Sequence, residues 1–271
     1  MGLGLWSKVS CRPWRPIREH VRCTDHNMQE RDYLQMVEPL IIMPVKDSLE
    51  TAEQAIRSIV ASGHNVCVYD DYSTDENAAR LDALRDELGI RVVHIREVLD
   101  HPSPNYRWVL NTAQREAIEK NQDLVIIESD VIVKADTIDK LIVESQKSKE
   151  KSPIGMVAAV TVNEEGEVNF PYEYARKIQQ DGSCSKRFSF CCTLLTNAFL
   201  KAYSFEQLDP TKNWYDVHIS HMSRQLGFEN ILQLSNPVLH KPHSSRPWKQ
   251  LKYKNPLLYY WRKLTQRRDK I

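Results

Sequence analysis

Short apolar runs alternate with amphipathic stretches from Glu38 to about residue 145. Apolar runs of the length expected for buried strands occur at 40–43, 66–69, 92–95 and 124–127. After them, apolar side chains recur at helical intervals over 49–61, 76–88, 105–120 and 135–145. Four repeats of strand and helix predict an α/β fold with a mostly parallel sheet flanked by helices, and ligands at the carboxyl ends of the strands.

The pattern is less regular in the second half of the chain. We expect a strand at 155–162, a long polar loop at 163–186, a strand at 188–195 that leads into a helix through Tyr203, a helix at 214–226, and short apolar runs at 231–234 and 237–240. Residues 1–36 show no sustained periodicity. The predicted organisation is an irregular N-terminal extension at 1–36, one domain at 37–245, and a basic, aromatic C-terminal helix at 246–271.

Composition narrows the class of protein. The 271 residues carry 37 Lys and Arg against 36 Asp and Glu, a net charge of +1 that gives no support for a nucleic-acid partner. The sequence contains no run of about eighteen apolar residues, so it predicts no membrane-spanning helix. The apolar residues at the N-terminus come before the first positive charges. A secretory signal has the opposite order, so we expect a cytoplasmic protein. The six cysteines form no CxxC pairs, which favours buried free thiols over disulfides or a zinc site.

Polar residues follow the first two predicted strands directly. Pro44, Lys46 and Asp47 come after the first, where a turn can hold a ligand through backbone groups. Asp70 and Asp71 come after the second, and adjacent carboxylates repel each other unless a donor or a cation compensates them. Capping of the next helix explains Asp75 but neither of these two aspartates.

An acidic turn follows the fourth predicted strand. Glu128 and Asp130, two residues apart after a buried apolar run, can both face one divalent cation, because Mg²⁺ and Mn²⁺ prefer oxygen ligands. The triplet alone is a common surface pattern, and its place after the strand is what gives it weight.

Together these motifs resemble the family 2 glycosyltransferases of the GT-A fold, over about Glu38 to Trp261. The resemblance implies that Pro44, Lys46 and Asp71 contact the nucleotide, with Asp71 at the base. It implies that Asp130 holds a metal, Mn²⁺ or Mg²⁺, on the diphosphate. Glu128 stands where the family often has Asp, and its longer arm makes a direct contact with metal or ribose less secure.

The resemblance extends into the second half of the chain. Asp216, within 214–228, matches the position of the family's catalytic base, although an acidic residue there also suits the positive end of a helix. His240 ends the last apolar run, where similar enzymes present a histidine to the metal, and a purely structural role is equally open. Asn111 matches a family asparagine, and Arg107 is a weaker candidate for a phosphate contact.

The resemblance implies an inverting, metal-dependent transfer from a nucleotide-diphosphate sugar to a hydroxyl of a glycan or lipid-linked glycan, in cell-surface glycan assembly. Two alternatives stay open. A sugar-phosphate nucleotidyltransferase should carry a glycine-rich loop after the first strand, which this chain lacks. A catalytically inactive nucleotide-sugar-binding module on the same fold is not excluded by the motifs.

The C-terminal tail concentrates positive charge. From Lys241 onward ten Lys and Arg stand against the single Asp269, and ten minus one gives +9. We favour a helix that packs its aromatic side chains on the sheet. Peripheral contact with the cytosolic face of a membrane comes next, and nucleic-acid binding is last.

Overall fold

The computed structural model describes residues 37–147, 152–212, 214–241 and 255–265. The account below concerns the unit that begins at Glu38. The extension predicted for 1–36 lies outside the described residues, as does the tail at 242–254 and 266–271.

The first half forms the predicted strand and helix repeats. Its strands are β1 (Leu40–Val45), β2 (Cys67–Asp70), β3 (Arg91–His94), β4 (Leu124–Ile127) and β5 (Val131–Ile132). Its helices are α2 (Leu49–Ala61), α3 (Asp75–Leu88), α4 (Tyr106–Glu119) and α5 (Thr137–Ser145), with a 3-10 turn, η1, at Ile95–Glu97.

The first strand is longer than predicted. Pro44 lies inside β1, because β1 stays paired with β2 through Val45. On its other side β1 pairs with β4 only as far as Ile42, so the N–H that proline lacks would have had no partner on β4.

The second half contains β6 (Ile154–Val162), β7 (Gly182–Ser183), β8 (Cys192–Leu195), β9 (Glu229–His240), α6 (Asn197–Ala202), α7 (Tyr215–Gln225), and the 3-10 turns η2 (Glu173–Lys177) and η3 (Phe205–Gln207). Two predictions need correction. The polar loop at 163–186 includes η2 and β7, and the apolar runs at 231–234 and 237–240 belong to one strand. Asp181 accepts hydrogen bonds from the backbone N–H groups of Leu234 and Ser235, so β9 continues past Pro237 through an irregular stretch.

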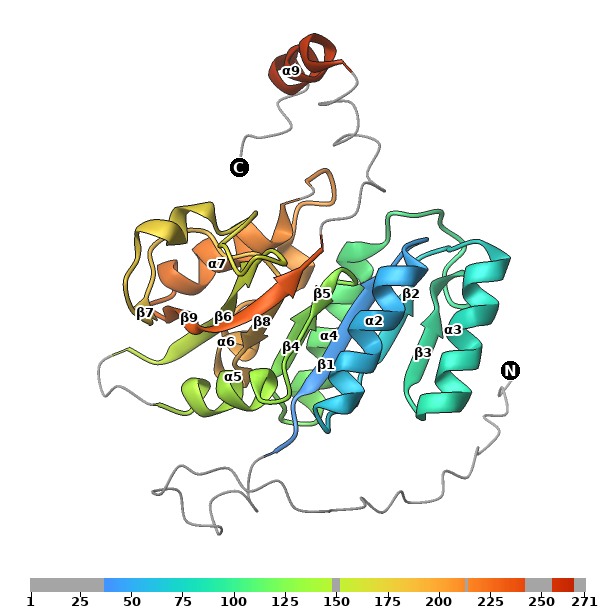
Figure 1. Ribbon diagram of the computed structural model, residues 1–271, viewed down its shortest axis with the longest axis horizontal. Helices are drawn as coiled ribbons and strands as arrows, with labels where there is room; N and C mark the ends of the chain where they lie inside the picture. The colour runs from blue at the N-terminus through green and yellow to red at the C-terminus, as the bar shows by residue number, and fades with distance from the viewer. Residues whose placement is uncertain (1–36, 148–151, 213, 242–254, 266–271) are drawn as a thin grey trace, which may run out of the picture. The chain divides into compact units, whose positions relative to one another are not determined.

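All these strands join one sheet, in the order β3-β2-β1-β4-β8-β6-β9-β5, with β7 paired to β9. Strands β3, β2, β1 and β4 are mutually parallel, β8 runs antiparallel to β4 and β6, and β6 and β9 are parallel. Figure 1 shows this arrangement, with α2 on the viewer's side of the sheet, α3 beside β3 at the right and α4 behind the sheet. The α/β prediction is confirmed, with a mixed rather than purely parallel second half.

The sheet reverses its strand order at β1. The chain adds β2 and β3 on one side of β1 and then returns to add β4 on the other side. In open α/β sheets the crevice at such a reversal, outside the carboxyl ends of the strands, is the usual ligand site. The turn residues after β1 and β4 therefore flank the expected site.

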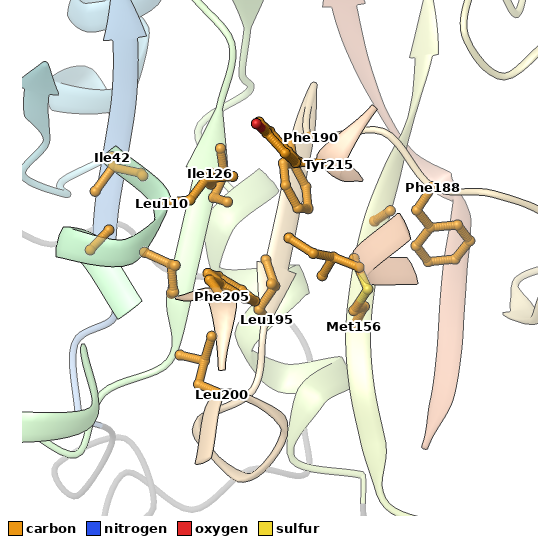
Figure 2. Packing of buried hydrophobic residues seen from close by; sticks show 14 of the residues in the cluster. Ile42, Leu110, Ile126, Met156, Phe188, Phe190, Leu195, Leu200, Phe205 and Tyr215 are labelled. Atoms are coloured by element: carbon orange, nitrogen blue, oxygen red, sulfur yellow. The ribbon is translucent and has the colours of Figure 1, made fainter. Parts of the chain in front are cut away.

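A large apolar cluster fixes the sheet against α4, α6 and α7. Figure 2 shows Ile42, Ile126, Leu195 and Met156 of four strands in this cluster, together with Leu110, Leu200 and Tyr215 of the helices. Most of these side chains are fully buried, and each such burial stabilises the fold by about 1.5–3 kcal/mol. The strand ends that carry the candidate site are thus anchored in a rigid core.

The C-terminal helix α9 spans Pro256–Thr265. Leu257, Tyr260 and Trp261 are 85, 53 and 63% exposed. The expectation that the tail packs its aromatic side chains on the sheet stays a prediction. Among the helices described, none is both long enough and apolar enough to cross a membrane.

Candidate functional site

The turns after β1 and β2 are bonded to each other. The backbone N–H of Asp47 donates to Ser73 Oγ (3.0 Å), and Asp47 Oδ1 accepts from the backbone N–H of Thr74 (2.8 Å). Asp47 itself has φ +50°, a left-handed conformation that Asp tolerates better than most residues. The two motifs that the sequence separates by more than twenty residues form one rigid edge.

Asp70, at the end of β2, is completely buried and is paired with a histidine. Its Oδ2 lies 2.7 Å from His94 Nδ1, and His94 Nε2 lies 3.2 Å from Asp82 Oδ1. Burial alone would lower the pKa of His94, but hydrogen bonds to Asp70 and Asp82 outweigh it and raise the pKa above the usual range. Asp70 is therefore held inside the fold by His94.

His94 was missed in the sequence, although a signal for it exists. Parallel pairing of β2 with β3 sets Asp70 opposite His94. A histidine at the carboxyl end of the strand next to an acidic motif is the pattern that would have indicated this partner.

Asp71 has a different set of partners. Its Oδ2 accepts from Ser103 Oγ (2.7 Å) and from the backbone N–H of Asn105 (3.0 Å), and its Oδ1 accepts from Asn105 Nδ2 (2.8 Å). A carboxylate has about four acceptor positions, so one remains for a ligand donor. Each of the two adjacent carboxylates thus has the partner it requires. His94 binds Asp70, and the loop before α4 binds Asp71.

Lys46 and Pro44 lie beside this edge. Lys46 is exposed and its Nζ lies 3.5 Å from the carbonyl oxygen of Asp71, while Pro44 is half-buried inside β1 opposite Tyr69. The structure therefore brings Lys46 and Asp71 together at the carboxyl end of β1 and β2. Their contacts with a nucleotide stay predictions.

Strand register assembles the acidic turn with residues far away in sequence. The pair Ile127 and Cys192 of β4 and β8 places Cys191 across from Glu128, and the backbone N–H of Glu128 donates to the carbonyl of Cys191 (3.0 Å). The pair Val131 and His240 of β5 and β9 likewise places His240 next to Asp130.

The side chains of this turn form one cluster. One ligand atom each from Glu128, Cys191 and His240 lies within 4.8 Å of the others, and His240 Nε2 lies 3.5 Å from Asp130 Oδ2. His240 is 3% exposed. Carboxylate and imidazole groups that converge in this way match the donor set of a divalent cation.

The orientation of the His240 ring supports a ligand role. Nδ1 lies 2.7 Å from the backbone carbonyl oxygen of Phe170, an acceptor only, so Nδ1 carries the proton. Nε2 is then the nitrogen that faces Asp130. A histidine whose second nitrogen donates to a backbone carbonyl is the usual arrangement behind a metal ligand.

Cys191 was not expected in the site. It is 1% exposed, and its Sγ lies 3.3 Å from Glu128 Oε2. Burial, and then the charge of Glu128, raise the pKa of the thiol well above its usual range. The thiol is therefore protonated and donates to Glu128. Sequence pattern gave no signal for it, because its place follows from the pairing of β4 with β8.

Asp216 lies at the beginning of α7, as predicted. Its Oδ1 accepts from the backbone N–H of Val217 (2.8 Å), and Trp214, the residue before the helix, offers no side-chain cap. The neighbouring Tyr215 ring contacts Tyr106 of α4, at 6.3 Å between centroids. Asp216 thus sits next to the helix that follows the Asp71 partners, and its bond to Val217 suits the alternative of a helix-end role as well.

Arg107 points elsewhere than expected. Its Nη2 donates to the carbonyl of Glu206 (2.6 Å) and so fastens α4 to η3. Asn111 Nδ2 donates to the carbonyl of Arg107 one turn earlier on α4. A phosphate contact of Arg107 stays a prediction, and it would require this bond to be given up or shared.

The structure resembles solved glycosyltransferase structures. TarS 1-349 of S. aureus matches with a TM-score of 0.56 and 14% identity, covering 87% of this chain and 67% of that chain. A longer TarS structure matches with the same score, and there the chain spans 41% of its length. GalNAc-T7 with UDP, GalNAc and Mn²⁺ has a TM-score of 0.51 and 12% identity, covering 78% of this chain and 45% of that chain.

These likenesses show that the chain has the GT-A fold. No family model matches its sequence. No curated protein sequence matches it either.

Proposed function

We propose that this chain is a glycosyltransferase that moves a sugar from a nucleotide-diphosphate sugar to a hydroxyl acceptor. The observation that supports this proposal most strongly is that Glu128, Asp130 and His240 converge at the sheet edge where the strand order reverses. Support also comes from TarS 1-349 in complex with UDP, with a TM-score of 0.54, and from GalNAc-T7 with UDP, GalNAc and Mn²⁺.

In this proposal Lys46 and Asp71 hold the nucleotide at the carboxyl ends of β1 and β2. Asp130 and His240 hold a divalent cation, Mn²⁺ or Mg²⁺ in the first instance, with Glu128 beside them. When bound, such a cation offsets the negative charge that develops on the leaving diphosphate. The buried His240, fixed by Phe170, keeps its ligand atom in place before substrate arrives.

Asp216 acts as the base. It removes the proton of the acceptor hydroxyl while the oxygen attacks the anomeric carbon from the face opposite the diphosphate, which inverts the configuration. Its half-buried place at the beginning of α7 leaves the carboxylate accessible.

The acceptor in this proposal is a glycan or lipid-linked glycan, assembled at the cytosolic face of a membrane. The basis is α9, which exposes Leu257, Tyr260 and Trp261 within a tail of charge +9. Aromatic and cationic side chains together suit the headgroup region of an anionic membrane.

Release of nucleoside diphosphate from nucleotide sugars in the presence of Mn²⁺ tests the proposal. A thermal-shift screen first selects the nucleotide sugars that bind, because only a ligand of the native state raises the melting temperature. Asp130→Asn should abolish metal-dependent release, whereas Asp136→Asn, on an exposed turn with a Lys140 ion pair, should not.

The products separate the alternatives. Pyrophosphate formed from a nucleoside triphosphate and a sugar phosphate would indicate the nucleotidyltransferase. Binding of a nucleotide sugar without any turnover, in the presence of a range of acceptors, would indicate the inactive binding module.

A further inference from the structure

Cys191 occupies the candidate cation site and has no role in the proposed transfer. It comes directly before β8 and its place is fixed by main-chain bonds, since its carbonyl accepts from the N–H of Glu128 (3.0 Å) and Cys192 pairs with Ile127. The backbone of Cys191 is therefore held beside Glu128 by the central sheet.

Two contacts in the cluster have the spacing expected between ligands of a four-coordinate cation. Bonds of about 2.0–2.3 Å from zinc to oxygen, nitrogen and sulfur, at tetrahedral angles, separate neighbouring ligand atoms by about 3.3–3.8 Å. Cys191 Sγ and Glu128 Oε2 are 3.3 Å apart, and His240 Nε2 and Asp130 Oδ2 are 3.5 Å apart. The ligand atoms of Glu128, Cys191 and His240 lie within 4.8 Å of one another, so side-chain adjustments would bring the three onto one ion.

The chemistry of the donors distinguishes between cations. Mg²⁺ takes oxygen ligands and does not favour sulfur, whereas Zn²⁺ and Co²⁺ accept mixed sets of sulfur, imidazole and carboxylate. A site that buries a thiol next to a histidine is therefore matched to the second group.

We propose that Cys191 is a cation ligand together with Glu128 and His240, and that the site prefers thiophilic divalent ions such as Zn²⁺ and Co²⁺ over Mg²⁺. The inference rests on the proposed function only in placing a cation at this turn, and it revises the expectation from cysteine spacing that a zinc site is absent. On binding, a sulfur–metal bond forms, the thiol proton passes to solvent, and no electrons are transferred.

The ring and hydroxyl groups around the cluster fit this role. Phe170 fixes the Nδ1 proton of His240, which leaves Nε2 for the ion. Ser189 Oγ lies 3.5 Å from Cys191 Sγ and can donate to a metal-bound thiolate. Hydrogen bonds of this kind orient metal ligands and adjust their strength.

Titration of the metal-free full-length protein with Co²⁺ tests the inference. A cobalt–thiolate bond gives a charge-transfer absorption band in the near ultraviolet, which oxygen and nitrogen ligands alone do not produce. We expect the band in the wild type and in Cys192→Ser, a control at the adjacent buried thiol, and its loss in Cys191→Ser. The same variant should weaken Zn²⁺ and Co²⁺ binding by about tenfold or more and leave the affinity for Mg²⁺ nearly unchanged.

Persistence of the band in Cys191→Ser would overturn the inference, and so would a wild type that binds Co²⁺ without it. Zinc-edge X-ray absorption on the wild type, which requires no variant, should show one sulfur in the first shell, and a shell of oxygen and nitrogen only would contradict the proposal. Sugar transfer with Mn²⁺ and no sulfur–metal bond would refute this inference alone. A sulfur–metal bond in a protein without transfer would refute the proposed function alone.

Discussion

At the scale of single residues, the candidate base gives a clear prediction. Asp216→Asn keeps the oxygen that accepts from the Val217 N–H, so α7 and nucleotide binding should be preserved. Loss of a general base typically costs about 10²–10⁴-fold in rate. We expect transfer to fall by at least about 100-fold, measured as glycosylated acceptor per unit time, with an unchanged thermal shift by the donor. Near-normal transfer would assign the base elsewhere and leave Asp216 its helix-end role.

A second residue-scale prediction concerns His64, which lies after α2 and contacts Glu38 and Asp139. Burial by itself would lower the pKa of His64, but the hydrogen bonds that the ring donates to Asp139 and Glu38 raise it from 6.5 to about 9. The protonated form is favoured by folding, so this contribution is complete below pH 6.5 and is lost as the pH rises through about 9. Both carboxylates are partly exposed, so we expect about 2 kcal/mol.

Urea unfolding between pH 6 and pH 10 measures this contribution. The free energy of unfolding of the wild type should fall over that range relative to His64→Gln, which lacks the titrating group. A constant difference between the two proteins would show that folding does not change the pKa of His64.

The residue scale also shows how far the sequence could predict the site. Repulsion between Asp70 and Asp71 indicated that compensating groups were needed, and it could not say which. Ser103 lies in a loop without periodicity, and nothing in the helix predicted for 105–120 indicated that Asn105 at its start would bind Asp71. Cys191 reaches Glu128 only through the pairing of β4 with β8. Side chains at strand ends were predictable, whereas their partners across the sheet required the strand order.

At the scale of elements, β6 and α7 meet at a glycine. A Cβ added at Gly155 would lie 2.3 Å from Ser223 Oγ and 2.7 Å from Phe228 Cβ. Such contacts are too short for the neighbours to accept without displacement. Gly155→Ala should lower the free energy of unfolding by about 1–3 kcal/mol, measured by urea denaturation.

Gly155→Ala combined with Ser223→Ala is the matched variant for this contact. It removes the shorter contact but also the hydrogen bond of Ser223 Oγ to Asn230 (2.7 Å), so it should not restore stability. A stable Gly155→Ala protein would mean that Phe228 has room to move.

Elements with strong periodicity were predictable, and short ones were not. The helix at 49–61 and the strand at 124–127 have the predicted bounds, because apolar spacing and flanking polar residues both mark them. β5 and β7 have two residues each and carry no periodic signal. Pro237 divided β9 into two runs in the sequence, although Asp181 binds the backbone N–H groups of Leu234 and Ser235 within the irregular stretch between them.

At the scale of the whole molecule, the proposed membrane contact is testable by flotation with vesicles of phosphatidylcholine and phosphatidylglycerol. The full chain should float with anionic vesicles and lose binding as salt rises, because exposed charges are screened. Leu257→Asp with Trp261→Asp should reduce the floating fraction, whereas Val98→Asp, at an exposed apolar residue of the sheet domain, should not. Equal recovery of all three proteins in the unbound fraction would remove the membrane from the proposal.

The position of β9 has a consequence for synthesis of the chain. β9 is the last strand that the structure describes, yet it lies inside the sheet, between β6 and β5. Until it emerges from the ribosome, one edge of β6 has no partner, and β6 is the uncharged, β-branched run IGMVAAVTV. Exposed edges of that composition pair with other chains. A chain that stops at residue 228 should therefore aggregate in a cell, and folding intermediates of the full chain should need a chaperone until His240 has been added.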